Sequence, residues 1–86
     1  MGFEFDPKKS ARNREKHGID FIDAQQLWED LNAIGFPARS DDEERFALLA
    51  KFKSRVWVAF YTLRANQIRL ISVRRARLGE KDYYES

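Results

Sequence analysis

The apolar positions of the chain follow a helical spacing up to about residue 31 and a strand spacing after it. Between residues 20 and 31 an apolar side chain recurs every three or four positions, at Phe21, Ala24, Leu27, Trp28 and Leu31. This spacing is typical of one face of an α-helix that packs against a core. Asp20 precedes the stripe and can cap the helix, and Trp28 is interpreted as a packing residue. The pattern therefore predicts a core-facing helix.

An earlier helix is predicted from its end signals. Asp6 can cap the free amides of a helix and Pro7 suits its first turn. The helix should continue to about His17, because Gly18 is a typical C-terminal stop.

The interior of this first helix is almost entirely polar, and basic residues share one of its faces, at Lys8, Arg12 and Lys16. Like charges at this spacing destabilise an isolated helix slightly, so local stability does not explain them. Either the face is solvated and the helix is held at its ends by Phe5, Ala11 and Ile19, or the face is a basic ridge that contacts phosphates or a partner.

The remainder of the chain is typical of short strands separated by polar breaks. Pro37 restricts the strand that contains it to a sheet edge or a bulge. The three longest apolar segments are rich in aliphatic and aromatic residues, which predicts a three-stranded antiparallel meander. The expected strands are Gly2–Phe5 at an edge, Ala33–Ala38, Arg45–Phe52, Val56–Leu63 and Ile68–Val73, and Glu80–Glu85 is expected to form a short closing helix.

The middle strand of the meander is apolar on both faces. Val56, Val58 and Phe60 alternate with Trp57 and Ala59, so both faces should be covered. We expect the helix pair to cover one face and the C-terminal segment, through Tyr83 or Tyr84, to cover part of the other. The predicted fold class is α+β, with two N-terminal helices packed on a twisted antiparallel sheet and a short C-terminal helix. We expect one domain over residues 1–86.

Composition excludes several kinds of site. The 86 residues include no cysteine and one histidine, which excludes disulfides, thiolate zinc sites and cysteine nucleophiles. The four glycines are too dispersed for a dinucleotide or phosphate loop. We therefore expect neither a metal nor a cofactor. The longest mostly apolar segment, 56–63, is far too short to span a bilayer, so we expect a cytoplasmic protein.

Charge is unevenly distributed along the chain. The formal net charge is only +2, yet residues 51–78 carry eight basic side chains and no carboxylate. Such an asymmetry favours a polyanionic partner, either a phosphate backbone or an acidic protein. The alternative is a solvated strand surface whose charges only aid solubility.

Several short motifs resemble, in order, those of the BrnT-type toxins of bacterial type II toxin–antitoxin systems. The match spans nearly the whole chain. It comprises Phe3-Glu4-Phe5-Asp6-Pro7-Lys8, Asn13, Lys16-His17-Gly18-Ile19, Glu44-Arg45-Phe46, Tyr61-Thr62-Leu63-Arg64, Ile68-Arg69-Leu70-Ile71-Ser72-Val73-Arg74-Arg75-Ala76, Glu80 and Tyr84-Glu85.

The resemblance implies a RelE-like ribonuclease fold and RNA cleavage without a metal, which arrests translation. It also implies an antitoxin partner with a ribbon-helix-helix DNA-binding domain, and contact with operator DNA only through the toxin–antitoxin complex. The alternative is a non-catalytic module that binds nucleic acid or only docks the antitoxin.

Two arginines are the leading candidates for stabilising a phosphate during cleavage. Arg64 and Arg74 end two neighbouring predicted strands, and the guanidinium group can hold phosphate in two places without losing its charge. A tight hairpin would leave them at opposite ends of the strands. The alternative for either is an ion pair with Glu29, Asp30 or Glu44.

Proton transfer has three candidate groups. His17 is the only histidine, and histidine is the side chain whose ordinary pKa lies nearest neutrality. At a helix C-terminus a histidine suits the role of general acid. The alternative is that His17 only caps the helix. Glu44 could act as the base. Tyr84 could stack on a nucleobase or assist proton transfer, or it could close the core. The remaining candidates are expected to bind RNA through charge: Lys16, Arg45, Lys51, Lys53, Arg69, Arg75 and Arg77.

Overall fold

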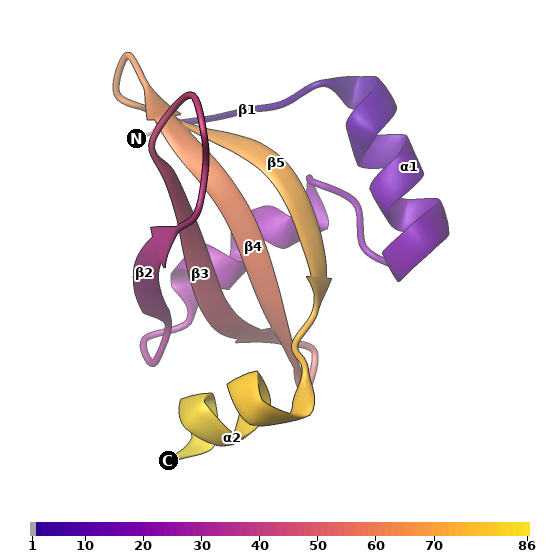
Figure 1. Cartoon of the computed structure of the whole chain (residues 1–86). Helices are drawn as coiled ribbons and strands as arrows, with labels where there is room; N and C mark the ends of the chain where they lie inside the picture. Colours follow the sequence, from indigo (N-terminus) through magenta and orange to yellow (C-terminus); the bar gives the residue numbers. More distant parts are fainter. Residues whose placement is uncertain (1) are drawn as a thin grey trace.

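The structure, a computed structural model, describes residues 2–86 and is built on a five-stranded sheet with the order β1-β5-β4-β3-β2 (Figure 1). The strands are β1 (Gly2–Glu4), β2 (Ile34–Ala38), β3 (Arg45–Phe52), β4 (Arg55–Arg64) and β5 (Gln67–Arg75). The helices are α1 (Pro7–His17), the 3₁₀ segment η1 (Asp23–Glu29) and α2 (Leu78–Glu85). No helix in the described part of the chain is long and apolar enough to cross a membrane.

The prediction of two N-terminal α-helices is wrong, because the second one is the short 3₁₀ segment η1. A 3₁₀ helix has three residues per turn, so the buried residues Phe21, Ala24 and Leu27 fit its period as well as that of an α-helix. The segment ends at Asp30, whose carboxylate accepts hydrogen bonds from the backbone of Asn32 and Lys51. Leu31 lies beyond this end and is fully exposed, so it is not part of the core.

The expectation of an antiparallel sheet is also wrong, because β1 pairs with β5 in the parallel direction. The three-stranded meander leaves one edge of β5 free, and the first residues of the chain occupy that edge. Phe3 lies beside Ile68 in this pairing and contacts the Trp28 ring edge-on, at 5.2 Å between ring centroids. The sheet is therefore mixed, and its first strand is fixed by packing that involves residues far along the chain.

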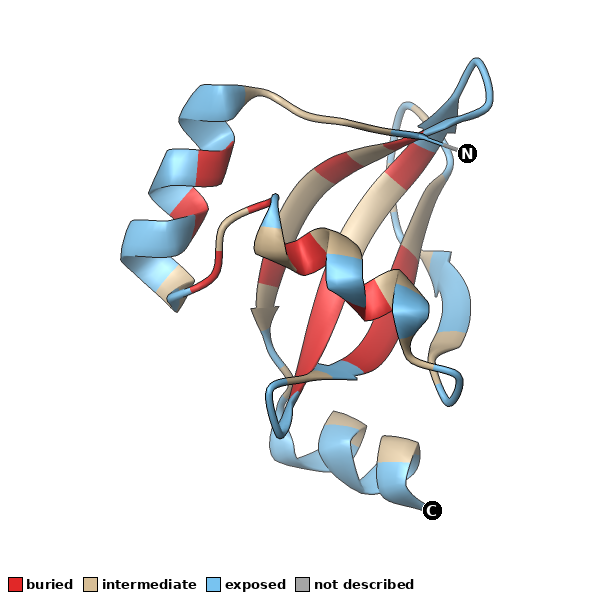
Figure 2. Cartoon of the chain, turned by 180° about the vertical axis from the view of Figure 1, so that it is seen from behind, coloured by how far each residue is buried: buried red, intermediate tan, exposed pale blue. Residues whose placement is uncertain are grey.

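The sheet buries apolar side chains on both faces, as the alternation in β4 predicts. We call the two sides the inner face and the outer face. The inner face packs against η1 and the segment after α1 (Figure 2), through Leu48, Ala50, Trp57, Ala59, Ile68, Leu70 and Val73. The outer face is covered at one end by α2, through Ala47, Leu49, Val56 and Val58, with Phe60 and Tyr84 packed against them. The rest of the outer face is free to carry polar side chains.

Helix α1 docks through buried polar side chains. The amide of Asn13 donates to the carbonyl oxygens of Ile19 and Val73, at 2.8 and 2.9 Å, and its oxygen accepts from the Val73 N–H at 3.1 Å. Strand β1 covers the β5 edge only at residues 67–69, so the edge groups of Val73 have no strand partner on that side. The Asn13 side chain supplies the hydrogen bonds that a neighbouring strand would make.

The ends of α1 are those that the sequence predicts. Asp6 accepts a hydrogen bond from the N–H of Lys8 at 2.9 Å, and Gly18 ends the helix with a φ of 84°. Ser10 is buried and accepts from the N–H of Phe21. Ala11, by contrast, is exposed and does not anchor the helix. The polar interior of α1 therefore has a packing role on one side and leaves its basic residues to solvent.

We expect the substitution Asn13→Ala to lower the free energy of unfolding by about 2–4 kcal/mol, because it leaves buried backbone groups of Val73 and Ile19 without partners. Alanine is the better helix former, so a loss in this direction cannot come from helix propensity. Urea denaturation measures it, with the exposed Lys8→Ala on the same helix as the control. Equal stabilities of the two variants would show that the Asn13 amide does not hold α1 on the sheet.

Candidate nucleic-acid interface

The outer face of the sheet gathers arginines from three strands. Arg45 of β3 and Arg64 of β4 lie on this face at one end, and Arg69 and Arg74 of β5 follow along the adjacent strand. Alternate residues of a strand point to the same face of the sheet, and each of these arginines alternates in step with the outer-face residues of its own strand. This brings together four of the cationic side chains that the sequence selects as RNA ligands or catalytic groups.

Arg64 and Arg74 nevertheless lie at opposite ends of the β4–β5 pair. Arg64 is paired with Gln67, whereas Arg74 is paired with Val58. The two pairs lie six residue steps apart along β4, which is roughly 20 Å at about 3.3 Å per residue. As the hairpin geometry suggests, these two arginines do not meet at one phosphate.

Three of the outer-face arginines form ion pairs, with partners other than those that the sequence suggests. Arg64 lies 3.4 Å from Glu43 and Arg69 lies 3.8 Å from Glu4. These contacts are single and partly exposed, so each contributes little to stability. A phosphate can displace such a partner at small cost.

Arg74 has a stronger partner. Its two terminal nitrogens donate to the two carboxylate oxygens of Glu80 at 2.8 and 2.9 Å, a bidentate pair. Its guanidinium carbon also lies 5.4 Å from the ring centroid of Phe60. The hydrogen bonds from Arg74 are the main reason that the pKa of Glu80 falls to about 2, and those to Glu80 are the main reason that the pKa of Arg74 rises. Glu80 thus fixes the orientation of the Arg74 guanidinium and occupies both of its terminal nitrogens.

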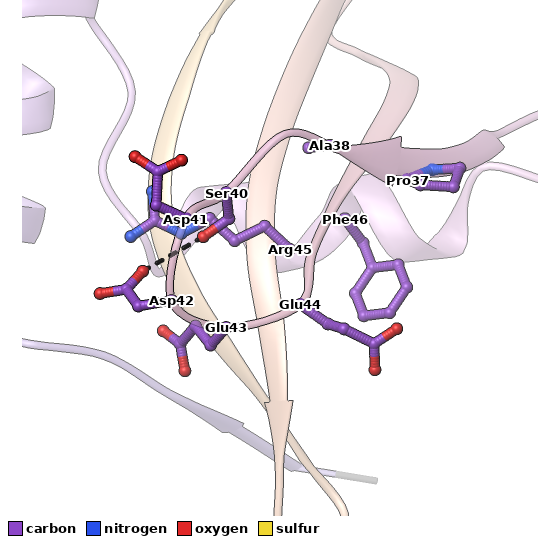
Figure 3. Close-up of a pocket in the computed structure, with 9 residues that line it drawn as sticks. All are labelled: Pro37, Ala38, Ser40, Asp41, Asp42, Glu43, Glu44, Arg45 and Phe46. Carbon is purple, nitrogen blue, oxygen red and sulfur yellow. Dashed lines mark hydrogen bonds between the residues drawn. The ribbon is translucent and has the colours of Figure 1, made fainter.

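The other end of the outer face is bordered by acidic side chains. Residues 41–44 of the β2–β3 loop line a cavity of about 440 Å³ together with Arg45 (Figure 3). Glu44 is exposed in this loop, and its backbone oxygen accepts a hydrogen bond from the hydroxyl of Thr62. The Nε atom of Arg45 is buried without a hydrogen-bond partner. Four neighbouring carboxylates make this cavity a poor site for a polyanion.

His17 and Lys16 line a different cavity, a cleft of about 240 Å³ between α1 and β5. Ile71 and Ser72 form the β5 side of this cleft. The register of β4 and β5 shifts here, because Phe60 pairs with Ser72 and Tyr61 with Leu70, leaving Ile71 as an extra residue. Such bulges redirect side chains and are frequent beside functional sites.

Ser72 joins the cleft to the outer face. It is paired with Phe60, the ring that Arg74 overlies, and it lies two residues before Arg74 on the same side of β5. His17 and Arg74 are therefore neighbours of the same serine. Of the four residues that the sequence selects for catalysis, His17 and Arg74 both lie near this end of β5, whereas Glu44 and Arg64 lie at the other end of the outer face.

The remaining cationic candidates are dispersed. Lys51 and Lys53 line a shallow cavity with Glu29 and Asp30 near the β3–β4 turn. Arg75 is on the inner side of the sheet edge, with its guanidinium 5.7 Å from the Trp57 ring centroid. Arg77 precedes α2, and its backbone N–H donates to Glu80. These residues do not form a continuous track with Arg74.

Tyr84 closes the outer face of the core, which is the second of the two roles considered for it. Its hydroxyl donates to Asp30 at 2.6 Å and ties α2 to the end of η1. This hydrogen bond is the main reason that the pKa of Tyr84 rises to about 12. Burial alone would raise the pKa of Asp30, but hydrogen bonds from Tyr84 and from the backbone of Lys51 and Asn32 outweigh it, so that pKa lies below its ordinary value.

Sequence reasoning missed Glu80 and Ser72 as parts of the site. The sequence shows Ser72 two residues before Arg74, a spacing that puts both side chains on the same face of a strand. The pairing of Glu80 with Arg74 was not, because it depends on how the chain turns between β5 and α2. Among residues 2–86, no group of three or more side chains is arranged to hold a metal ion.

We expect the Arg74–Glu80 pair to make stability depend on pH at acid values. Because the pKa of Glu80 is lowered from 4.5 to about 2 in the folded protein, its contribution is fully present above pH 4.5 and is lost as the pH falls towards 2. Glu80→Gln removes this titration. The difference in unfolding free energy between the original protein and this variant, measured in urea, should shrink steadily from pH 5 to pH 2. A constant difference over that interval would mean that the ion pair does not form in solution.

Comparison with known proteins gives an independent finding. Residues 5–80 match the family model described as ribonuclease toxin, BrnT, of type II toxin-antitoxin system. No curated protein matches the chain significantly. The family match covers most of the chain, which therefore belongs to the BrnT family of ribonuclease toxins.

Proposed function

We propose that this member of the BrnT family is an endoribonuclease that cuts RNA without a metal, at a site formed around Ser72 by Arg74 and His17. The family match supports ribonuclease activity and an antitoxin partner. The observation that carries the proposed site is that His17 and Ser72 line the same α1–β5 cleft, and that Ser72 lies two residues before Arg74 on the same side of β5.

The reaction uses the nucleophile that RNA itself provides. The 2′-oxygen attacks the adjacent phosphorus and forms a cyclic 2′,3′-phosphate, while the bond from phosphorus to the 5′-oxygen of the next nucleotide breaks. The proton of the 2′-hydroxyl passes to a base, and the leaving 5′-oxygen receives a proton from an acid. Charge develops on the non-bridging oxygens, so a fixed cation beside them accelerates the reaction.

Arg74 suits the role of that cation. Its fork is already held by Glu80 in a bidentate geometry, and a phosphoryl group presents two oxygens in a similar arrangement. Glu80 itself is a poor base near neutral pH, because its pKa of about 2 leaves it with little affinity for a proton. Its proposed role is to position Arg74.

His17 is the proposed proton-transfer group. It lines the cleft beside Ser72, and histidine exchanges a proton most readily near neutral pH. Arg64 is proposed to contact the RNA backbone away from the reacting phosphate, since it lies at the far end of the outer face. Arg45 lines the acidic cavity at that end, and we assign it no contact with RNA. Glu44 lies there too, and we assign it no step.

The biological setting follows from the same proposal. The protein would act in the cytoplasm, where cutting RNA arrests translation. Its antitoxin would carry a ribbon-helix-helix DNA-binding domain and bring the complex to operator DNA. Neutralisation would follow if the antitoxin covers the outer face or the cleft.

We expect the purified protein to cut single-stranded RNA in the presence of EDTA and to leave cyclic 2′,3′-phosphate ends, which mass spectrometry identifies. His17→Gln should lower the cleavage rate about 10²–10⁴-fold, because a positioned proton-transfer group contributes that much.

Glu15→Gln is the matched control, since Glu15 is an exposed neighbour on α1 and its rate should not change. RNA that is bound but never cut would contradict the proposed activity and favour a non-catalytic binding module. Equal rates for the two variants would remove His17 from the mechanism.

Arg74→Ala and Glu80→Gln distinguish a phosphate ligand from a structural ion pair. Both substitutions break the same pair, so a purely structural role predicts equal effects on cleavage. If Arg74 contacts the reacting phosphate, Arg74→Ala should lower the rate about 10²-fold or more, and Glu80→Gln should lower it far less because the guanidinium remains. Cleavage rates measured beside thermal unfolding separate the two roles, and parallel losses in both variants would contradict the assignment.

A further inference from the structure

The small cleft between α1 and β5 is lined by several positively charged side chains and by no carboxylate. Four cationic or ionisable nitrogen groups from one side of α1 line it: Lys9, Arg12, Lys16 and His17. Residues of β5 form its other side, and no carboxylate lines it. Its volume of about 240 Å³ is below the roughly 300–1,000 Å³ of pockets for drug-sized ligands.

Within the described residues, the lysines and the arginine of this cleft differ from three of the four outer-face arginines in having no acidic partner. Arg64, Arg69 and Arg74 each pair with a glutamate. Within the described residues, Lys9, Arg12 and Lys16 form no ion pair and no side-chain hydrogen bond. Their charges are therefore available to a ligand without displacement of a protein carboxylate.

Local stability does not account for this arrangement. Lys9 and Arg12 are three residues apart and Arg12 and Lys16 are four apart, so each pair is mutually repulsive on the helix surface. The first turn of α1 holds no acidic residue to offset them. The helix is fixed instead by Ser10 and Asn13 on its adjacent side.

This docking holds the cations along the β5 edge. Asn13 forms part of the cleft lining while its amide is bonded to Val73. The cleft is thus bounded by a helix and a strand whose relative position is set by buried hydrogen bonds. Ser72, which lines the cleft, lies two residues before Arg74 on the same side of β5.

We propose that the cations of this cleft bind the phosphodiester backbone of the RNA, next to the phosphate that is cut; the proposal rests on the function proposed above and extends the same site along α1. Three cations on one helix face match successive phosphates rather than a nucleobase, for which the cleft lining offers no Phe, Tyr or Trp ring. Binding here would depend on charge and not on base sequence.

The test measures binding without cleavage. The probe is a single-stranded RNA of mixed sequence with every 2′-hydroxyl methylated, which cannot attack its own phosphates. The variant Arg12→Gln/Lys16→Gln is compared with Arg14→Gln/Lys81→Gln, which removes the same charge from exposed positions outside the cleft. Arg14 is on α1 as well, where it pairs with Asp20. Circular dichroism and thermal unfolding verify that all variants fold.

We expect the cleft variant to reduce the slope of log Kd against log salt by about 1.4 and to weaken binding about 25-fold at 0.1 M salt, because each lost contact to single-stranded RNA changes the slope by about 0.7. Lys9→Gln alone should reduce the slope by about 0.7. The control variant should keep the slope of the original protein.

The outcomes separate this site from the enzymatic activity. If the original protein cuts unmodified RNA but the cleft and control variants have the same slope, the cleft proposal is overturned and the activity stands. If binding depends on the cleft but unmodified RNA is never cut, the activity fails and the cleft proposal stands. No binding to the probe at low salt, or loss of antitoxin binding with RNA binding intact, would overturn the cleft as an RNA site.

Discussion

The hydrogen bonds between Asn13 and Val73 determine how the other parts of the molecule are placed. A sheet that ends in an uncovered strand leaves edge amides and carbonyls without partners, and a buried group of this kind is costly. Here one side-chain amide satisfies both edge groups of Val73 and a carbonyl of the segment after α1. The helix is thereby held along β5 by polar contacts, and its remaining sides need not be apolar. That freedom allows α1 to present several cations to solvent beside the strand that carries Arg74.

A second constraint acts at the next residue of β5, where Glu80 of α2 holds Arg74 in a bidentate pair. An arginine that is to bind phosphate gains from being oriented in advance, because less side-chain entropy is then lost on binding. The carboxylate that orients it also competes for it. Glu80 begins a helix that is itself fixed by Tyr84 and Asp30, so the orientation of Arg74 depends on the docking of α2. Stability of the C-terminal helix and the geometry of the proposed site are consequently linked.

Much of the local structure could be predicted from particular residues. Asp6, Pro7 and Gly18 located the ends of α1, and alternation in β4 predicted apolar packing on both faces of the sheet. Pro37 located an edge strand. The nature of η1 could not be predicted, because a spacing of three fits both kinds of helix. The parallel pairing of β1 was hidden as well, since it joins residues separated by most of the chain.

The amino-acid sequence by itself determined which chemistry is available to this protein: many guanidinium and ammonium groups, a single histidine, no thiol, and motifs of the BrnT family. It determined this because composition and short motifs are properties of the chain alone. Only the tertiary structure decided which groups meet. It placed His17 in a cleft with Ser72, two residues before Arg74 on β5, left Arg64 beside an acidic loop, and packed Tyr84 against the outer core residues. The physical reason is that such encounters depend on strand register and on long-range hydrogen bonds, which no local pattern of residues encodes.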